Sequence, residues 1–178
     1  MLCNERKKVN WNEYQQQALT TAIYPLKREL EYTAFGLLSE LGELIAARVN
    51  GDKDLIRGEL GDNFWYTAAL ADAIKWPLEC VYSYTTTFRP VTTEQSLEAL
   101  VVLGGLIAGH IKKSIRDDDG FVSPKREKNI VACVSKYMHH LEFITSDYGS
   151  VNGILNENLN KLADRKSRGV LQGSGDKR

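Results

Sequence analysis

Two pairs of acidic residues recur at the same spacing in the first half of the chain. Glu40 and Glu43 form the first pair, and Glu59 and Asp62 form the second pair farther along the sequence. Residues three positions apart on an α-helix lie on one face, so each pair can present both carboxylates together. The Asn-Gly-Asp turn at residues 50–52 is short, and the two helices that it joins should be antiparallel neighbours. The spacing therefore predicts one cluster of four carboxylates.

A cluster of this kind needs positive charge, because four carboxylates repel one another and raise one another's pKa. Arg48 and Arg57 are candidate partners, but neither has the spacing that would neutralise both pairs. Mg²⁺ and Mn²⁺ prefer hard oxygen ligands, so the pattern favours a divalent metal site over a solvated acidic face. A di-iron site is not favoured, since such sites use Glu-x-x-His and no histidine follows Glu43 or Asp62 at that spacing.

The elements that carry these acids are predicted to be helices, because apolar residues recur at three- and four-residue steps along most of the chain. Strand patterns are almost absent, so we predict an all-α fold, an antiparallel bundle of six or seven helices. Asn10 and Asp54 are expected to cap the helices that follow them. The predicted helices cover residues 11–23, 31–49, 55–75, 77–84, 94–116, 125–148 and 152–168.

One domain is expected over residues 1–168, followed by a flexible polar tail at residues 169–178. A chain of this length can bury about 70% of its unfolded surface around a single core. Residues 34–38 can be laid on residues 99–103, and this similarity suggests that a helix pair has been duplicated and has diverged. On that interpretation residues 85–150 are a degenerate second repeat, and the alternative is that they are an insertion.

Charge and hydropathy exclude several classes of protein. Lys plus Arg and Asp plus Glu each number 23, so the formal net charge is zero, whereas a general nucleic-acid-binding protein would carry a basic excess. No apolar run approaches the roughly 18 residues that span a membrane. Residues 1–10 are charged and lack the apolar stretch of a secretory signal. We therefore expect no nucleic-acid partner, no membrane partner and a cytoplasmic location.

The residues around the acidic pairs resemble one enzyme family. Residues 40–43 read Glu-Leu-Gly-Glu, and residues 59–66 read Glu-Leu-Gly-Asp-Asn-Phe-Trp-Tyr. Both segments resemble the MazG-like branch of the all-α nucleoside triphosphate pyrophosphohydrolases. Residues 158–165 are similar to that family's closing Asn-x-x-Lys-Leu-x-x-Arg element. Residues 11–15 resemble its first helix, and the tail at residues 173–178 is similar to the tails of phage-type members.

The resemblance covers residues 11–83 and 151–178 and implies a role for individual side chains. Two or three Mg²⁺ ions, for which Mn²⁺ could substitute, would be held by Glu40, Glu43, Glu59 and Asp62. Glu40 or Glu43 would also orient the attacking water or take its proton. The substrate-binding residues would be Tyr66 at the sugar, Asn158 at the sugar or a phosphate, and Lys161 and Arg165 at phosphates. One departure is Ser39, where many members carry a further glutamate, and it puts any ligand or base role at that position in doubt.

Trp11 and Gln15 on the predicted first helix are the candidate base contacts, since a glutamine amide can read a base edge with a donor and an acceptor. The alternative for an aromatic residue at helical spacing is a place in the core. The implied reaction converts a (d)NTP to the (d)NMP and pyrophosphate, in a homodimer or a dimer of dimers. It would act on the dNTP pool, with dGTP as first candidate, and in the host cytoplasm if the protein is viral. The alternatives are a dUTP- or dCTP-directed enzyme of the same fold, and a catalytically silent helical module that binds a nucleotide or a partner protein.

Overall fold

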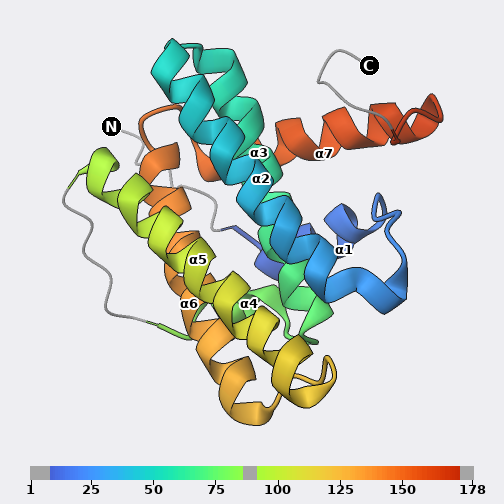
Figure 1. Ribbon diagram of the computed structural model, residues 1–178. Coiled ribbons are helices and arrows are strands. Elements are labelled where there is room, and N and C mark those ends of the chain that lie inside the picture. The colour runs from blue at the N-terminus through green and yellow to red at the C-terminus, as the bar shows by residue number, and fades with distance from the viewer. Residues whose placement is uncertain (1–8, 86–91, 173–178) are drawn as a thin grey trace.

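The computed structural model of the chain describes residues 9–85 and 92–172, and every regular element within them is helical (Figure 1). The prediction of an all-α fold is confirmed. The elements are α1 (Trp11–Leu19), the short 3₁₀ helix η1 (Leu26–Arg28), α2 (Glu29–Asn50), α3 (Lys53–Ala73), α4 (Leu78–Tyr82), α5 (Thr93–Asp118), α6 (Pro124–Thr145) and α7 (Val151–Ser167). Among these described helices, none is long and apolar enough to span a membrane. Most of the predicted tail, residues 173–178, lies outside the described residues.

A tight turn joins α2 and α3 into an antiparallel hairpin. Gly51 ends α2 in the left-handed conformation, with φ at 71°, which a residue without a Cβ atom adopts at little cost. Asp52 then takes the N-cap position of α3, and its side chain accepts hydrogen bonds from the backbone N–H groups of Asp54 and Leu55. The prediction of Asp54 as this cap is wrong, because Gly51 completes the turn early enough for α3 to begin at Lys53.

Two helices end earlier than their apolar patterns suggest. Asn10 caps α1 as predicted, but α1 ends at Leu19 rather than at residue 23, and α6 ends at Thr145 rather than at residue 148. The hydroxyl groups of Thr20 and Thr21 donate to carbonyl oxygens of the last turn of α1. These carbonyls lack helical partners, so side chains that satisfy them favour the end of the helix there.

The bundle consists of two hairpins that pack against each other. α5 and α6 form the second hairpin, α2 lies along α5, and α3 lies along α6 (Figure 1). Gly104 allows α5 to approach α2 closely, because a Cβ atom there would lie 2.8 Å from Cδ2 of Leu38. The core between the hairpins includes Phe64, Leu100 and Tyr137. α3 also contacts α1, α4 and α7, so it lies at the centre of the fold. That a helix pair has been duplicated stays a prediction.

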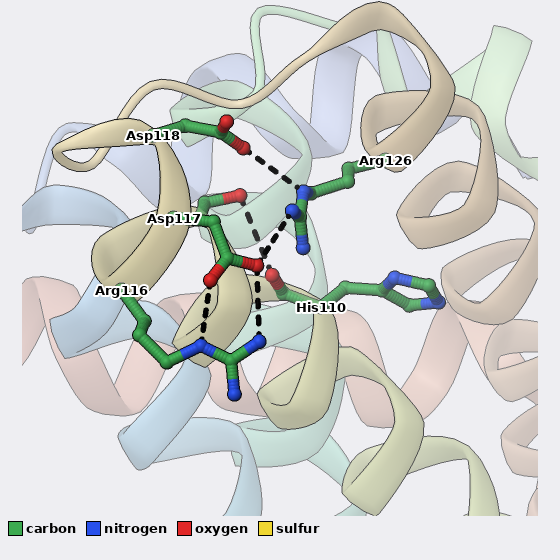
Figure 2. A network of polar contacts seen from close by, with 6 residues as sticks. His110, Arg116, Asp117, Asp118 and Arg126 are labelled. Atoms are coloured by element: carbon green, nitrogen blue, oxygen red, sulfur yellow. Dashed lines mark hydrogen bonds and ion pairs between the residues drawn. The ribbon is translucent and has the colours of Figure 1, made fainter.

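A network of charged side chains fastens the end of the second hairpin (Figure 2). Arg126 of α6 forms ion pairs with Asp117 at 3.0 Å and with Asp118 at 3.1 Å, both in the last turn of α5. Arg116 also donates to Asp117, and the hydrogen bonds from the two arginines lower the pKa of Asp117 to about 2. Exposed ion pairs of this kind contribute little free energy singly. Their consequence is geometric, since they hold the end of α5 against the start of α6.

Candidate functional site

Three of the four predicted carboxylates come together between α2 and α3. Glu40 and Glu43 extend from α2 and Glu59 extends from α3, and each offers an oxygen atom within 4.8 Å of the oxygens of the other two. We refer to these three residues as the acidic cluster. Glu59 is 2% exposed, whereas Glu43 is open to solvent. The acidic cluster therefore contains one buried acid, Glu59, one half-buried acid, Glu40, and one exposed acid, Glu43.

Within the acidic cluster, Glu40 has a strongly shifted pKa. The pKa of Glu40 is raised to about 8, first by burial, then by the negative charges of Asp62, Glu43 and Glu59, and also by a hydrogen bond to Glu59. Glu40 is therefore protonated at neutral pH when no cation is bound, because a carboxylic acid shares the site more easily than another carboxylate. Ser39 donates a hydrogen bond of 3.3 Å to Glu43 from one turn earlier on α2.

Asp62 lies outside the three mutually close carboxylates, but its charge is the largest of those that raise the pKa of Glu40, so it faces the same site. Lys161 of α7 places its Nζ atom 2.5 Å from Oδ2 of Asp62, and Nδ2 of Asn158 donates to Oδ1 at 2.6 Å. The helix spacing brought the acid to the right face of α3, but α7 then supplies a cation and an amide that hold it. Lys161, predicted to contact phosphate, is engaged by Asp62.

Asn158, a predicted substrate-binding residue, is almost fully buried against α3. It is 3% exposed, and its Oδ1 atom is buried without a hydrogen-bond partner among the described residues. A Cβ atom on Gly61 would lie 2.8 Å from Cβ of Asn158, so a glycine is needed for α7 to pack this closely on α3. A buried acceptor without a donor costs free energy, and this one belongs to the side chain that also donates to Asp62. Arg165 lies two turns farther along α7 than Asn158 and is 5% exposed.

Tyr66 lies at the rim of the acidic cluster, one turn after Asp62 on α3. Its ring lies against Gly36 of α2 and belongs to an aromatic group with Tyr32 and Trp65, at centroid distances of 6.3 and 4.9 Å. Burial raises the pKa of the Tyr66 hydroxyl, followed by its hydrogen bond to Tyr32 and the nearby carboxylates. The structure thus places Tyr66 beside the acids, as the sequence order suggests, with its ring held by α2.

Trp11 and Gln15 lie in the core, and this placement corrects their prediction as base contacts. Trp11 is 2% exposed and stacks on Phe64 and Tyr82. The side-chain amide of Gln15 is used up by three main-chain atoms, the carbonyl oxygens of Ala68 and Trp76 and the N–H of Leu78. A side chain whose donors and acceptor are already satisfied in the interior has nothing to offer a base. Both residues fasten α1 to α3 and α4.

Two buried polar residues near the acidic cluster, Asn63 and Tyr137, were not predicted as site residues from the sequence. The Tyr137 hydroxyl donates to Oδ1 of Asn63 at 2.7 Å, and Nδ2 of Asn63 donates to the carbonyl oxygen of Glu59 at 2.9 Å. Both side chains are fully buried, and burial raises the pKa of the Tyr137 hydroxyl. Asn63 could have been noticed as a polar residue on an otherwise apolar face of α3. Tyr137 carries no such signal, because its role depends on the packing of α6.

The comparisons with known proteins add one relative. The chain is 36% identical over 80 residues to the Gene 37 protein of Mycobacterium phage L5, and the match covers 44% of this chain and 70% of that protein. The name of that protein states no activity. No family model matches the chain. No solved structure matches it.

Proposed function

We propose that this chain, which belongs to the same family as the Gene 37 protein of Mycobacterium phage L5, is a metal-dependent nucleoside triphosphate pyrophosphohydrolase of the MazG-like type. The observation that carries the proposal is the acidic cluster, whose three carboxylates lie within 4.8 Å of one another, with Lys161 of α7 nearby on Asp62. The reaction adds water across the anhydride between the α- and β-phosphates of a (d)NTP. The products are the (d)NMP and pyrophosphate.

The donor set of the acidic cluster fits Mg²⁺ or Mn²⁺. All three groups are carboxylates, which are hard oxygen ligands, and among the described residues no histidine or cysteine joins them. The raised pKa of Glu40 supports the same fit, because the group retains a proton for want of a cation. When bound, divalent ions would neutralise the triphosphate and lower the pKa of a water molecule.

Side chains of this chain can activate the water and bind the phosphates and the sugar. Glu43, the exposed member of the acidic cluster, can orient the attacking water and accept its proton, while Ser39 holds one of its oxygens. Lys161 and Arg165 stand four positions apart on α7 and can face phosphate oxygens together. When a triphosphate arrives, Lys161 can exchange Asp62 for phosphate, and that exchange would release Asp62 as a further ligand. Tyr66, which lies beside the acids, can contact the sugar of the nucleotide with its ring.

The test of this proposal is release of pyrophosphate and a nucleoside monophosphate. Purified protein is incubated with each common NTP and dNTP and with dUTP, in Mg²⁺, in Mn²⁺ and in EDTA. We expect release that depends on the metal and is abolished by EDTA, with deoxynucleotides preferred and dGTP tested first. Preference for dUTP or dCTP would keep the reaction and change the base.

A matched pair of variants assigns the activity to the acidic cluster. Glu43→Gln should lower kcat by at least about a hundredfold, since it removes a general base or ligand. Glu13→Gln alters an exposed acid of α1 and should leave kcat unchanged. Full activity of Glu43→Gln would refute the assigned site. Absence of release from every nucleotide, with nucleotide still bound, would replace the proposal with a catalytically silent binding module.

A further inference from the structure

The outward face of α5 changes character along its length. It begins acidic, is apolar and small in the middle, and ends basic. The exposed or half-exposed residues along it are Glu94, Glu98, Val101, Val102, Gly105, Leu106, Gly109, Lys112, Lys113 and Arg116. The helix belongs to residues 85–150, the part of the chain that the resemblance to the pyrophosphohydrolase family does not cover. Nothing in the proposed reaction uses this face.

The middle of this face exposes three large apolar side chains to solvent. Val101 is 49% exposed, Val102 is 61% exposed and Leu106 is 48% exposed. Between and beside them, Gly105 and Gly109 have nothing within 4 Å of where a Cβ atom would stand. Single exposed apolar residues are ordinary, but a contiguous group marks an interaction site. Gly105 and Gly109 lie one turn apart and have no side chains. Another helix can therefore approach α5 at the lower end of the usual 8–10 Å interaxial distance.

The charges at the two ends of the face are self-complementary. Glu98 precedes Gly105 by two helical turns and Lys112 follows it by two turns. Val101 and Gly109 are likewise placed one turn before and one turn after Gly105. If two copies of α5 cross antiparallel at Gly105, each Glu98 meets the Lys112 of the other copy. Each Val101 then meets a Gly109, so a large side chain faces a gap.

The two charged residues that this pairing needs have no competing partner nearby. Within the described part of the chain, neither Glu98 nor Lys112 forms an ion pair, and both are exposed. By contrast, Glu94 pairs with Arg48 and Arg116 pairs with Asp117 in the same chain. A partner of uniform charge would be repelled by one end of the face, whereas a second copy in the opposite direction satisfies both ends.

We propose that the outward face of α5 is the surface through which two copies of this chain associate, antiparallel and with Gly105 at the two-fold axis. The arrangement is isologous, so every contact occurs twice. It has an apolar centre and a charged rim, as protein interfaces generally do.

The first test measures the molecular mass of the full chain in solution by sedimentation or light scattering, over a hundredfold range of concentration. We expect a concentration-dependent dimer for the unaltered chain and a monomer for Leu106→Glu. The matched control is Leu26→Glu, which alters the 78% exposed Leu26 of η1 and should leave the dimer intact. A monomer at all concentrations, or a dimer that withstands Leu106→Glu, would overturn the proposal.

The second test addresses the antiparallel register. Glu98→Lys and Lys112→Glu should each weaken the dimer about tenfold or more, because each turns two attractive contacts into repulsive ones. The double variant Glu98→Lys/Lys112→Glu should return the dissociation constant to within about threefold of the unaltered chain. Two weak single variants without recovery in the double variant would reject the register. Neither residue lies in the core, so these variants remain informative even if Leu106→Glu fails to fold. The outcome is independent of the proposed enzyme activity.

Discussion

Lys161 Nζ lies 2.5 Å from Oδ2 of Asp62, so an ammonium group of α7 stands beside the carboxylate that the sequence pattern assigned to a metal. Asn158 donates to the other oxygen of the same carboxylate. Asp62 therefore has a cation and an amide as partners before any divalent ion binds, whereas the three glutamates of the acidic cluster face one another. A divalent ion that takes Asp62 as a ligand has to compete with Lys161.

Removing that competing cation should strengthen metal binding in the absence of nucleotide. For Lys161→Met we expect the dissociation constant for Mn²⁺ alone to fall by about threefold to tenfold, or roughly 0.7–1.4 kcal/mol. The same variant should bind a triphosphate more weakly. Titration calorimetry with Mn²⁺ measures the first effect. The control is Lys166→Met, since Lys166 is on the same helix and donates to Thr20 instead. An unchanged Mn²⁺ affinity in Lys161→Met would show that no such competition exists.

The stability of the metal-free protein should fall as pH rises from acid to mildly alkaline values. The folded pKa of Glu40 is raised to about 8 from an ordinary 4.5, mainly by burial. A raised carboxyl pKa means that the folded state binds the proton more tightly, so this contribution is complete below pH 4.5 and is lost as pH rises through 8. Allowing for solvent screening, the loss is on the order of 2 kcal/mol.

Urea unfolding in EDTA at several pH values tests this expectation. Glu40→Gln has no proton to lose, so its midpoint should change less between pH 5 and pH 8 than that of the unaltered chain. Mg²⁺ should reverse the loss at pH 8, because a bound cation replaces the proton. Parallel pH profiles for the two proteins would remove Glu40 as the source of the effect.

Two glycines on α2 should respond oppositely to alanine. At Gly36 an added Cβ atom would overlap the Tyr66 ring, whereas at Gly42 it would meet nothing within 4 Å. We expect Gly36→Ala to destabilise the protein by about 1–3 kcal/mol as the ring is displaced. Gly42→Ala should stabilise the protein by up to about 1 kcal/mol through helix propensity. Thermal unfolding checks both values, and equal shifts in the two variants would contradict the Tyr66 packing.

Gln15 should prove to be a structural residue rather than a substrate contact. Gln15→Ala removes three hydrogen bonds to main-chain atoms and leaves buried groups unsatisfied, which should cost about 2–4 kcal/mol. The neighbouring Gln16 is exposed, so Gln16→Ala should cost less than about 0.5 kcal/mol. Denaturant unfolding gives both values. A change in base preference by Gln15→Ala without loss of stability would restore the original prediction.

Much of the fold could be predicted from the sequence because the signals are local. Helical periodicity, the Asn10 cap and the turn at Gly51 depend on residues within a few positions of one another. The same locality explains why Glu40, Glu43 and Glu59 could be placed together, since one short turn sets the register of α2 on α3. The errors in this part are small shifts, such as Asp52 capping α3 in place of Asp54.

The remaining features depend on contacts between residues distant in the chain, which no spacing encodes. Lys161 meets Asp62 across 99 positions, and Tyr137 meets Asn63 across 74. The residue types and the spacing of Trp11 and Gln15 fit a nucleotide contact and a core position equally well. Packing against α3 and α4 decides that both are buried. The sequence by itself determined the helices and the pairing of acids, because these follow from the 3.6-residue repeat. Which acid takes a lysine, which aromatic residue is buried and which helix face stays open were decided by tertiary packing, where shape and burial outweigh local preference.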